Sequence, residues 1–270
     1  MNKLLVFTDL DGTLLDHENY DWSAAQPALQ RLEQLGFPLI FNTSKTLAEL
    51  IPLSQQLNNP HPMICENGNV AAIPNHYEQS SSPQNTGYTN TLFGMHYDMI
   101  IQQLHQLRSE LGFHFSGFKD LGVTGVMEQT GLDKTRAQQA CNRLCSEPLL
   151  WLDDDAKLTT FRNELAKRDL TLTQGGRFYH VLSPVNKGHT MAWLLEKFQQ
   201  WQSTTRWITV ALGDGKNDQQ MLEAADHPVL IKNPHSTPPN VNHLPQLISP
   251  QKVGPAGWNQ AINQIIDTYI

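Results

Sequence analysis

Two short apolar runs, each followed at once by aspartate and glycine, constrain the fold of this chain more than any other feature. The first run covers residues 4–7 and leads into Asp9 and Asp11, and the second covers 206–212 and leads into Asp214. A short apolar run bounded by a turn is typical of a buried strand, and ligands in open α/β sheets bind beyond the carboxyl ends of such strands. The pattern therefore predicts a parallel sheet with acidic side chains at one edge.

The spacing of Asp9 and Asp11 predicts that their carboxylates converge. In an extended segment, residues i and i+2 point to the same side, and Gly12 lets the backbone turn sharply after them. A solvated aspartate–glycine turn would produce the same short sequence. The second cluster, around Asp214, favours a site, because crowded carboxylates repel one another unless a cation or a shared proton relieves the repulsion. We therefore expect a divalent metal ion here.

Four ordered motifs carry a family resemblance. They are Asp9-Leu10-Asp11-Gly12-Thr13, the strand-terminal Thr43, Lys187, and Gly213-Asp214-Gly215-Lys216-Asn217-Asp218. With this combination the chain resembles the haloacid dehalogenase superfamily of phosphatases over almost its whole length. A narrower resemblance, to the mannosyl-3-phosphoglycerate phosphatase family, is carried by Asn-Thr-Ser-Lys-Thr at 42–46, Glu-Asn-Gly at 66–68, and Gly-Gly-Arg-Phe-Tyr-His at 175–180 upstream of Asn-Lys-Gly at 186–188.

The resemblance implies catalysis by two aspartates and a magnesium ion. Asp9 is the expected nucleophile, which forms an aspartyl phosphate. Asp11 is expected to protonate the leaving alcohol and then to deprotonate the attacking water. Mg²⁺ is expected on the Asp9 side chain, the Asp11 backbone carbonyl and Asp214, because hard oxygen ligands without histidine or cysteine suit this ion.

Three further residues complete the catalytic set that the resemblance implies. Thr43 is expected to donate a hydrogen bond to a phosphoryl oxygen, and Lys187 to neutralise charge on the phosphoryl group in the transition state. Asp218 is expected to orient Lys187 and a metal-bound water. Lys187 also precedes an expected helix, whose first backbone N–H groups favour an anion.

Substrate-binding residues are expected near the second and third strands and in the middle of the chain. The candidates are Ser44, Lys45, Glu66, Asn67, Arg177 and His180. The planar guanidinium of Arg177 suits a carboxylate, such as that of a glycerate. Glu66 and Asn67 have a structural alternative as turn or helix caps, and His180 has one as a hydrogen-bonded residue of the protein interior.

Charge and cysteine usage exclude other classes of protein. The net charge of −7 argues against nucleic-acid binding, which requires a basic face. The three cysteines form no Cys-x-x-Cys pair, so we expect reduced thiols, with Cys141 and Cys145 one turn apart on a helix. The sequence contains neither a long apolar span nor a signal-peptide pattern, which predicts a cytoplasmic protein without membrane contact.

Strand and helix patterns alternate at both ends of the chain. Strands are expected at 4–7, 37–41, 63–65, 207–212 and 229–231, and helices at 22–35, from a capping box at 46–49, from 187, and at 258–269. This order predicts a doubly wound parallel-sheet core of the Rossmann-like α/β class. We assign it to residues 1–82 and 187–270.

The middle of the chain differs in pattern. Residues 80–91 are rich in serine, glutamine and asparagine and are expected to form a linker. Beyond it, helical stripes at 100–111, 137–144 and 158–165 are separated by strand patterns at 113–118, 149–152, 170–173 and 178–182. Half-buried strands of this kind predict an antiparallel sheet covered by helices on one face. We therefore expect an inserted α+β cap domain at 83–186.

Three functions are compatible with these residues. The resemblance favours a magnesium-dependent phosphomonoesterase that converts mannosyl-3-phosphoglycerate to mannosylglycerate, with a small phosphorylated sugar-glycerate as its binding partner. A related sugar-phosphate phosphatase, or a phosphotransferase or phosphomutase with the same Asp9 nucleophile, is the alternative. A non-catalytic binding protein is the third, but it would be expected to have lost some of the acidic motif residues, and all of them are present.

Overall fold

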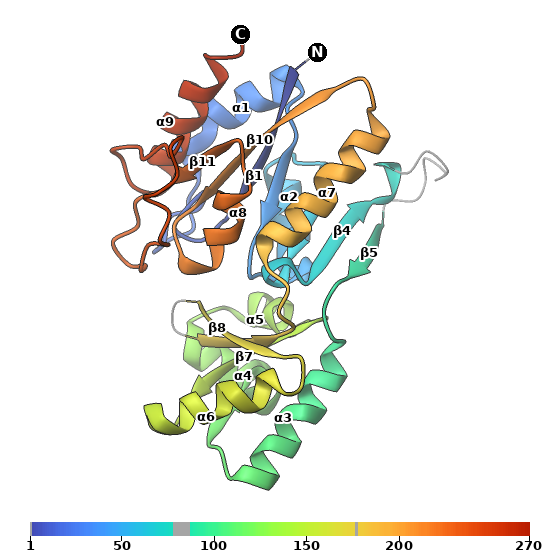
Figure 1. Ribbon diagram of the computed structural model, residues 1–270, viewed down its shortest axis with the longest axis vertical. Coiled ribbons are helices and arrows are strands. Elements are labelled where there is room, and N and C mark those ends of the chain that lie inside the picture. Colours follow the sequence, from blue (N-terminus) through green and yellow to red (C-terminus); the bar gives the residue numbers. More distant parts are fainter. Residues whose placement is uncertain (1, 78–86, 176–177) are drawn as a thin grey trace. The chain divides into compact units, whose positions relative to one another are not determined.

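The computed structural model describes residues 2–77, 87–175 and 178–270, and these form two compact units (Figure 1). The first unit consists of Met1–Thr43, His61–Ile64 and Asn186–Ile270, and the second of Ser44–Pro60 and Cys65–Val185. The second unit thus contains the expected insertion, except for Asn186, together with two earlier segments. The division into a core and a cap at residues 83 and 187 stays a prediction.

The first unit contains a sheet of parallel strands. Its strands are β1 (Asn2–Thr8), β2 (Leu39–Asn42), β3 (Met63–Cys65), β10 (Arg206–Gly213) and β11 (His227–Leu230), in the order β11-β10-β1-β2-β3. β1 is an interior strand, because β2 and β10 pair with its two edges. The strand order reverses at this point, which is where open α/β sheets bind their ligands.

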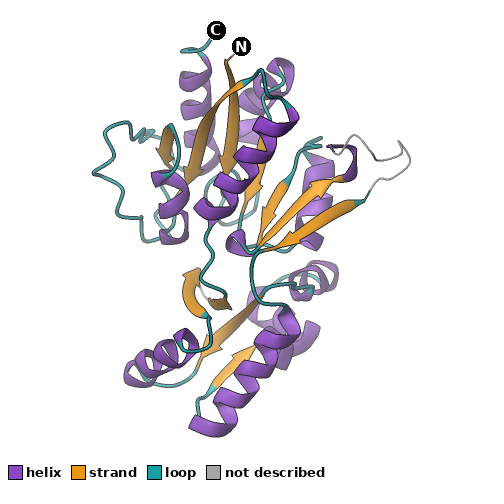
Figure 2. Cartoon of the chain, turned by 45° about the vertical axis from the view of Figure 1, so that its right-hand side comes forward, coloured by secondary structure: helices purple, strands orange, loops and turns teal. Residues whose placement is uncertain are grey.

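Helices cover both faces of this sheet (Figures 1 and 2). α1 (Gln26–Leu35) and α9 (Gly254–Ile266) pack on one face, and α7 (Lys187–Trp201) and α8 (Gln219–Glu223) on the other. β1 and β10 are therefore apolar on both faces, and residues 4–7 are fully buried. The expected doubly wound α/β core is confirmed.

The second unit contains an antiparallel pair and a separate antiparallel sheet. The pair is β4 (Val70–Pro74) with β5 (Tyr88–Leu92). The sheet has the order β6-β7-β9-β8, with β6 at Phe115–Gly117, β7 at Ser146–Trp151, β8 at Thr171–Gly175 and β9 at Phe178–Leu182. The α-helices of this unit are α2 (Leu47–Gln56), α3 (Tyr97–Leu111), α4 (Phe118–Thr130), α5 (Lys134–Cys141) and α6 (Asp155–Ala166).

Two hydrophobic clusters stabilise the antiparallel sheet and its helices. In the larger one, α3 and α6 pack against the face of the sheet that carries Leu149 and Val181. In the smaller one, α4 and α5 pack against each other and against Phe178. The antiparallel sheet agrees with the sequence pattern, and α3 and α6 cover one face as expected. Phe178 is three residues from Val181 in β9 and therefore lies on the opposite face, so α4 and α5 depart from the predicted one-sided cover.

Several local predictions need correction. The expected linker at 80–91 includes most of β5, and the structure does not describe residues 78–86. The helix expected at 137–144 ends at Cys141, so Cys145 is buried outside it. α4 was not predicted, because Gly122, at φ +61°, and Gly125 interrupt its apolar period.

The predicted capping box is present at the start of α2. The backbone N–H of Glu49 donates to the Thr46 hydroxyl (3.1 Å), and the backbone N–H of Thr46 donates to the Glu49 carboxylate (2.8 Å). Pro52 lies inside this helix. In the described parts of the chain, no helix has the length and apolar character needed to cross a membrane.

Candidate active site

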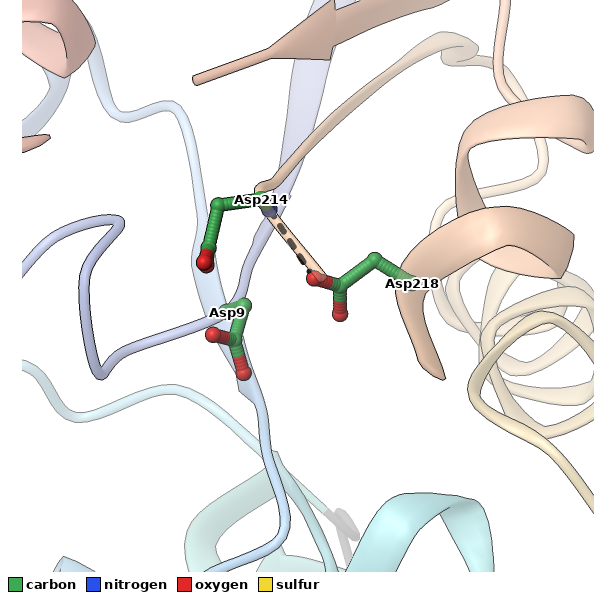
Figure 3. A group of neighbouring side chains, drawn as sticks. All are labelled: Asp9, Asp214 and Asp218. Atoms are coloured by element: carbon green, nitrogen blue, oxygen red, sulfur yellow. Dashed lines mark hydrogen bonds between the residues drawn. The ribbon is translucent and has the colours of Figure 1, made fainter. Parts of the chain in front are cut away.

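Asp9 and Asp214 follow the ends of two neighbouring strands, β1 and β10. The register pairs Thr8 with Leu212, and the backbone N–H of Asp9 donates to the Leu212 carbonyl (2.9 Å), which extends the pairing by one residue. Asp218 lies close by, and one carboxylate oxygen from each of the three aspartates falls within 4.8 Å of the others (Figure 3). All three side chains are buried.

Lys187 is the cation of this cluster. It is fully buried, and its Nζ lies 2.5 Å from Asp9 Oδ1 and 2.5 Å from Asp218 Oδ1. Lys187 begins α7, where the side chain of Asn186 caps the helix by accepting from the backbone N–H of His189 (3.0 Å). The Lys187 carbonyl accepts a hydrogen bond from Asn42 Nδ2 at the end of β2 (3.1 Å). The start of α7 is thus fixed against the carboxyl edge of the sheet.

Asp218 uses both oxygens within the site. Oδ1 accepts from Lys187, and Oδ2 accepts from the backbone N–H groups of Asp214 (3.0 Å) and Gly215 (2.9 Å), the first of which is drawn in Figure 3. Gly213 makes this close approach possible, because a Cβ there would lie 2.5 Å from the Asp218 side chain. Asp218 therefore contacts Lys187, the residue that it was expected to orient, and it also holds the loop that carries Asp214.

Asp214 has polar partners that were not among the predicted site residues. Thr13 Oγ1 donates to its Oδ1 (2.7 Å), Asn233 Nδ2 donates to its Oδ2 (2.8 Å), and Ser236 Oγ donates to its backbone carbonyl (3.0 Å). Thr13 stood within a quoted motif without a role. Asn233 comes shortly after the strand pattern at 229–231. Polar residues that follow the carboxyl end of a buried strand are site candidates, as Asp9 and Asp214 are, so the same criterion would also have identified Asn233.

Burial and mutual repulsion raise the pKa of two of these carboxylates. The pKa of Asp9 lies well above its usual value, because burial disfavours the charged form and Asp218 and Asp214 repel it, although Lys187 opposes the shift. Burial and Asp218 also raise the pKa of Asp214, and the nearby Thr13, Ser236 and Asn233 side chains oppose this shift.

For Lys187, nearby charges have a larger effect on the pKa than burial has. Burial by itself lowers the pKa of its ammonium group, but the carboxylates of Asp218 and Asp9 outweigh burial and hold the pKa above its ordinary value. One lysine charge faces the carboxylates of Asp9, Asp214 and Asp218, so the cluster favours a further cation.

The donor set fits a hard divalent metal ion. It offers carboxylate oxygens and no histidine or cysteine, the chemistry that Mg²⁺ prefers. Because Asp218 is committed to Lys187 and to two backbone N–H groups, Asp9 and Asp214 are the better placed side chains to hold the ion. The Asp11 carbonyl stays a predicted ligand. It lies in a turn in which Gly12 has φ +82° and its backbone N–H donates to the Leu15 carbonyl (2.8 Å).

Thr43 follows β2, the other neighbour of β1. Its side chain is buried, and its backbone N–H donates to the Ile64 carbonyl at β3 (3.1 Å). Since β1, β2 and β10 are parallel, Thr43 lies at the same edge of the sheet as Asp9 and Asp214. Its expected contact with a phosphoryl oxygen stays a prediction.

Most of the expected substrate-binding residues belong to the second unit. Glu66 is fully buried there, and its carboxylate accepts from the backbone N–H of Leu144 (2.8 Å), the backbone N–H of Cys145 (3.0 Å) and the Ser146 hydroxyl (2.6 Å). These bonds join the segment after β3 to the start of β7. They favour the structural alternative for Glu66, in which its carboxylate connects two segments of this unit by hydrogen bonds.

The remaining candidates have different surroundings. Asn67 is buried, and its backbone φ is +57°. The backbone carbonyl of Ser44 accepts a hydrogen bond from Arg143 Nη1 (2.9 Å). The backbone carbonyl of Lys45 accepts one from the Glu66 N–H (3.0 Å). His180 is buried in β9, and among the described residues its Nδ1 has no hydrogen-bond partner. Burial, assisted by Arg143, lowers its pKa to about 3. Arg177 lies outside the described residues.

Comparison with known proteins identifies a family. A model of haloacid dehalogenase-like hydrolases matches residues 6–241. The chain is 37% identical over 267 residues to a glucosyl-3-phosphoglycerate/mannosyl-3-phosphoglycerate phosphatase of Methanococcoides burtonii, an alignment that covers 98% of this chain and 97% of the relative. These matches confirm the resemblance that the sequence motifs carry.

Solved structures agree at the level of the fold. A Thermoplasma acidophilum protein has a TM-score of 0.69 with 15% identity and coverage of 98% of this chain and 99% of that chain. A haloacid dehalogenase-like hydrolase of Bacteroides thetaiotaomicron has a TM-score of 0.67 with 16% identity and coverage of 98% and 100%.

Proposed function

Because the chain belongs to the haloacid dehalogenase-like hydrolases, we propose that it hydrolyses a phosphate monoester with Asp9 as nucleophile and mannosyl-3-phosphoglycerate as substrate. The observation that carries the proposal is the contact of buried Lys187 with both Asp9 and Asp218 beside Asp214. It supports the proposal because a carboxylate held at a strand end could attack phosphorus, and the ammonium group beside it could stabilise charge on a bound phosphoryl group.

The proposed reaction has two steps. In the first, an Asp9 oxygen attacks phosphorus, the bond from phosphorus to the ester oxygen breaks, and Asp11 gives its proton to the departing alcohol. In the second, Asp11 removes a proton from water, the water oxygen attacks phosphorus, and the bond from phosphorus to the Asp9 oxygen breaks, which releases inorganic phosphate and restores the Asp9 carboxylate. Lys187 holds the Asp9 carboxylate in one orientation through Oδ1. Asp218 in turn holds Lys187.

A magnesium ion is part of the proposal. Asp9 and Asp214 would hold it together with the Asp11 carbonyl, and it would supply positive charge to the phosphoryl oxygens. Burial and repulsion between the carboxylates raise the pKa values of Asp9 and Asp214, and this supports the role, since a bound cation would favour the charged form of both side chains.

The substrate assignment depends on the relative's name and on the family motifs. The relative from Methanococcoides burtonii acts, by its name, on glucosyl- and mannosyl-3-phosphoglycerate. Both substrates carry a carboxylate, and Arg177, outside the described residues, is the proposed cation for it. Ser44, Lys45, Asn67 and His180 remain proposed sugar contacts, and the proposal includes the cytoplasmic location expected from the sequence.

A phosphate-release screen tests the proposal. Purified protein with Mg²⁺ is assayed against mannosyl-3-phosphoglycerate, glucosyl-3-phosphoglycerate, simple hexose phosphates and an aryl phosphate. We expect the glycosyl-glycerate phosphates to be the best substrates. Preference for a hexose phosphate would overturn the substrate assignment alone, and transfer of phosphate to a second sugar would favour a phosphotransferase.

The nucleophile is tested separately. Asp9→Asn is expected to abolish both turnover and an acid-stable, hydroxylamine-labile phosphoenzyme, because an amide does not attack phosphorus. Asp16→Asn makes the same chemical change in a nearby loop, where the Asp16 carboxylate accepts from the backbone N–H groups of Glu18 and Asn19, and this variant should remain active. Normal turnover by Asp9→Asn would exclude the covalent mechanism.

A further inference from the structure

The segment after β11 supplies a side chain to Asp214 from outside the motifs described above. Asn233 Nδ2 lies 2.8 Å from Asp214 Oδ2, while Thr13 Oγ1 lies 2.7 Å from Oδ1. Each oxygen of this carboxylate therefore accepts one neutral donor. Two donors on opposite oxygens restrict rotation of the carboxylate and favour its charged form, yet each oxygen keeps a second lone pair for a ligand.

The orientation of the Asn233 amide is fixed by its other end. Its Oδ1 accepts from the backbone N–H of His235 (2.9 Å), so the NH₂ group is the end that faces Asp214. The backbone around Asn233 is also anchored, because Ile231 N–H donates to the Gly213 carbonyl (2.9 Å) and Gly254 N–H donates to the Lys232 carbonyl (3.2 Å). The donor is thus held in place before any ligand binds.

Gly12 provides the space that Asn233 occupies. A Cβ at Gly12 would lie 2.1 Å from Asn233 Nδ2 and 3.3 Å from Asp214 Oδ2. The amide therefore lies directly against the turn that follows Asp11. Asn233 contacts both the turn of the nucleophile motif and the carboxylate at the end of β10.

We propose that Asn233 is a positioning residue that presents the Asp214 carboxylate to the divalent metal ion. It is not a catalytic residue, since its contact is with Asp214. The inference rests on the proposed function, which makes Asp214 a metal ligand. Hydrogen-bond partners of metal-binding carboxylates fix ligand orientation, and their loss typically weakens metal affinity about 10- to 100-fold.

The test compares two substitutions in the same loop. Asn233→Ser removes the donor to Asp214 but keeps a short side-chain oxygen that accepts from the N–H two residues ahead, so it preserves the local turn. Ser236→Ala is the matched control, because the Ser236 hydroxyl donates to the backbone carbonyl of Asp214. Asn233→Ala serves as a second variant.

Mg²⁺ binding to the metal-free protein is measured by isothermal titration calorimetry, and the thermal midpoint is measured in EDTA. We expect the Mg²⁺ dissociation constant to rise about 10- to 100-fold in both Asn233 variants. We expect less than a threefold rise in Ser236→Ala, and an unchanged KM for the phosphate ester at saturating Mg²⁺ in all variants. Thermal midpoints in EDTA within a few degrees of wild type would show that the variants fold.

Other outcomes overturn the inference in distinguishable ways. Wild-type affinity in folded Asn233→Ser, or equal losses in Asn233→Ser and Ser236→Ala, would contradict the positioning role and leave the proposed function standing. If neither Asn233 variant folds in EDTA, Asn233 is a structural residue of this loop, and the positioning role is rejected. Absence of Mg²⁺ binding by the wild-type protein would overturn both the inference and the metal site of the proposed function.

Discussion

The ammonium group of Lys187, on the first residue of α7, lies 2.5 Å from Oδ1 of Asp9 at the end of β1, although the two residues are 178 positions apart in the sequence. The same Nζ contacts Asp218, and all three side chains are buried. The lysine therefore neutralises part of a buried negative charge as well as orienting the expected nucleophile. This double role gives Lys187 an effect on stability that is separate from its effect on catalysis.

Replacing Lys187 by methionine should destabilise the fold as well as abolish turnover. The substitution leaves Asp9 and Asp218 buried without their cation, and breaking a buried ion pair from one side costs about 3–5 kcal/mol. Urea unfolding in EDTA measures the loss. Lys187→Met combined with Asp218→Asn should recover part of it, because the double variant buries one charge fewer. A loss below about 1 kcal/mol in the single variant would contradict this role of the pair.

Asp11→Asn should slow alkyl phosphate hydrolysis far more than aryl phosphate hydrolysis. An activated aryl leaving group needs little protonation, whereas an alkyl alcohol requires a general acid, and this assistance contributes about 10²- to 10⁴-fold. Initial rates on one substrate of each kind, at saturating Mg²⁺, check the expectation. Equal losses on both substrates would show that Asp11 acts only on the structure of the site.

Glu147 should make the stability of the protein depend on pH. Its Oε1 accepts from the Lys119 N–H (2.8 Å) and its Oε2 from the Tyr97 hydroxyl (2.9 Å), and burial raises its pKa to about 7. Because the folded state binds this proton more tightly than the unfolded state, the contribution of Glu147 to stability is complete below about pH 4.5 and is lost as the pH rises through about 7.

Glu147→Gln measures that contribution. One pKa unit corresponds to about 1.4 kcal/mol, so the wild-type protein should lose a few kcal/mol relative to this variant between pH 4.5 and 8. Urea unfolding of both proteins at several pH values gives the difference at each pH. A difference that stays constant with pH would show that the pKa of Glu147 is not raised in the folded state.

Glu66→Gln separates a structural from a substrate-binding role. Glutamine has one acceptor oxygen where glutamate offers two to Leu144, Cys145 and Ser146, so at least one buried donor loses its partner. We expect a loss of about 1–3 kcal/mol and faster hydrogen exchange at the Leu144 and Cys145 amides. A raised KM with unchanged stability and exchange would assign Glu66 to the substrate instead.

The strand ends were the most predictable part of this protein. β1 and β10 are buried on both faces, so their sequences are nearly continuous apolar runs, and the polar residues that follow them stand out. Asp9 and Asp214 were found in this way. α4 was missed for the opposite reason, since Gly122 and Gly125 remove the apolar period by which a helix is recognised.

The surroundings of each site residue were not predictable from local sequence. The capping box at Thr46 was identified because its partners lie three residues apart. Glu66 and its partners are about 80 residues apart, and nothing near Glu66 in the sequence indicates that its carboxylate accepts from Leu144 and Cys145. A glutamate that binds a sugar and a glutamate that only stabilises the fold would be the same residue type at the same strand end, so the local sequence does not distinguish the two roles.

The sequence by itself determined the class of the fold and the aspartates of the site, because periodicity, strand termination and motif spacing are local properties of the chain. Only the tertiary structure decided which groups surround those aspartates. Asn233 and Thr13 hold the two oxygens of Asp214, and Lys187 bridges Asp9 and Asp218. These contacts join segments that are distant in the sequence, and parallel pairing of β1 with β10 brings their ends together. Hydrogen bonds and charge interactions act over a few ångströms, so they are fixed by that pairing and not by position along the chain.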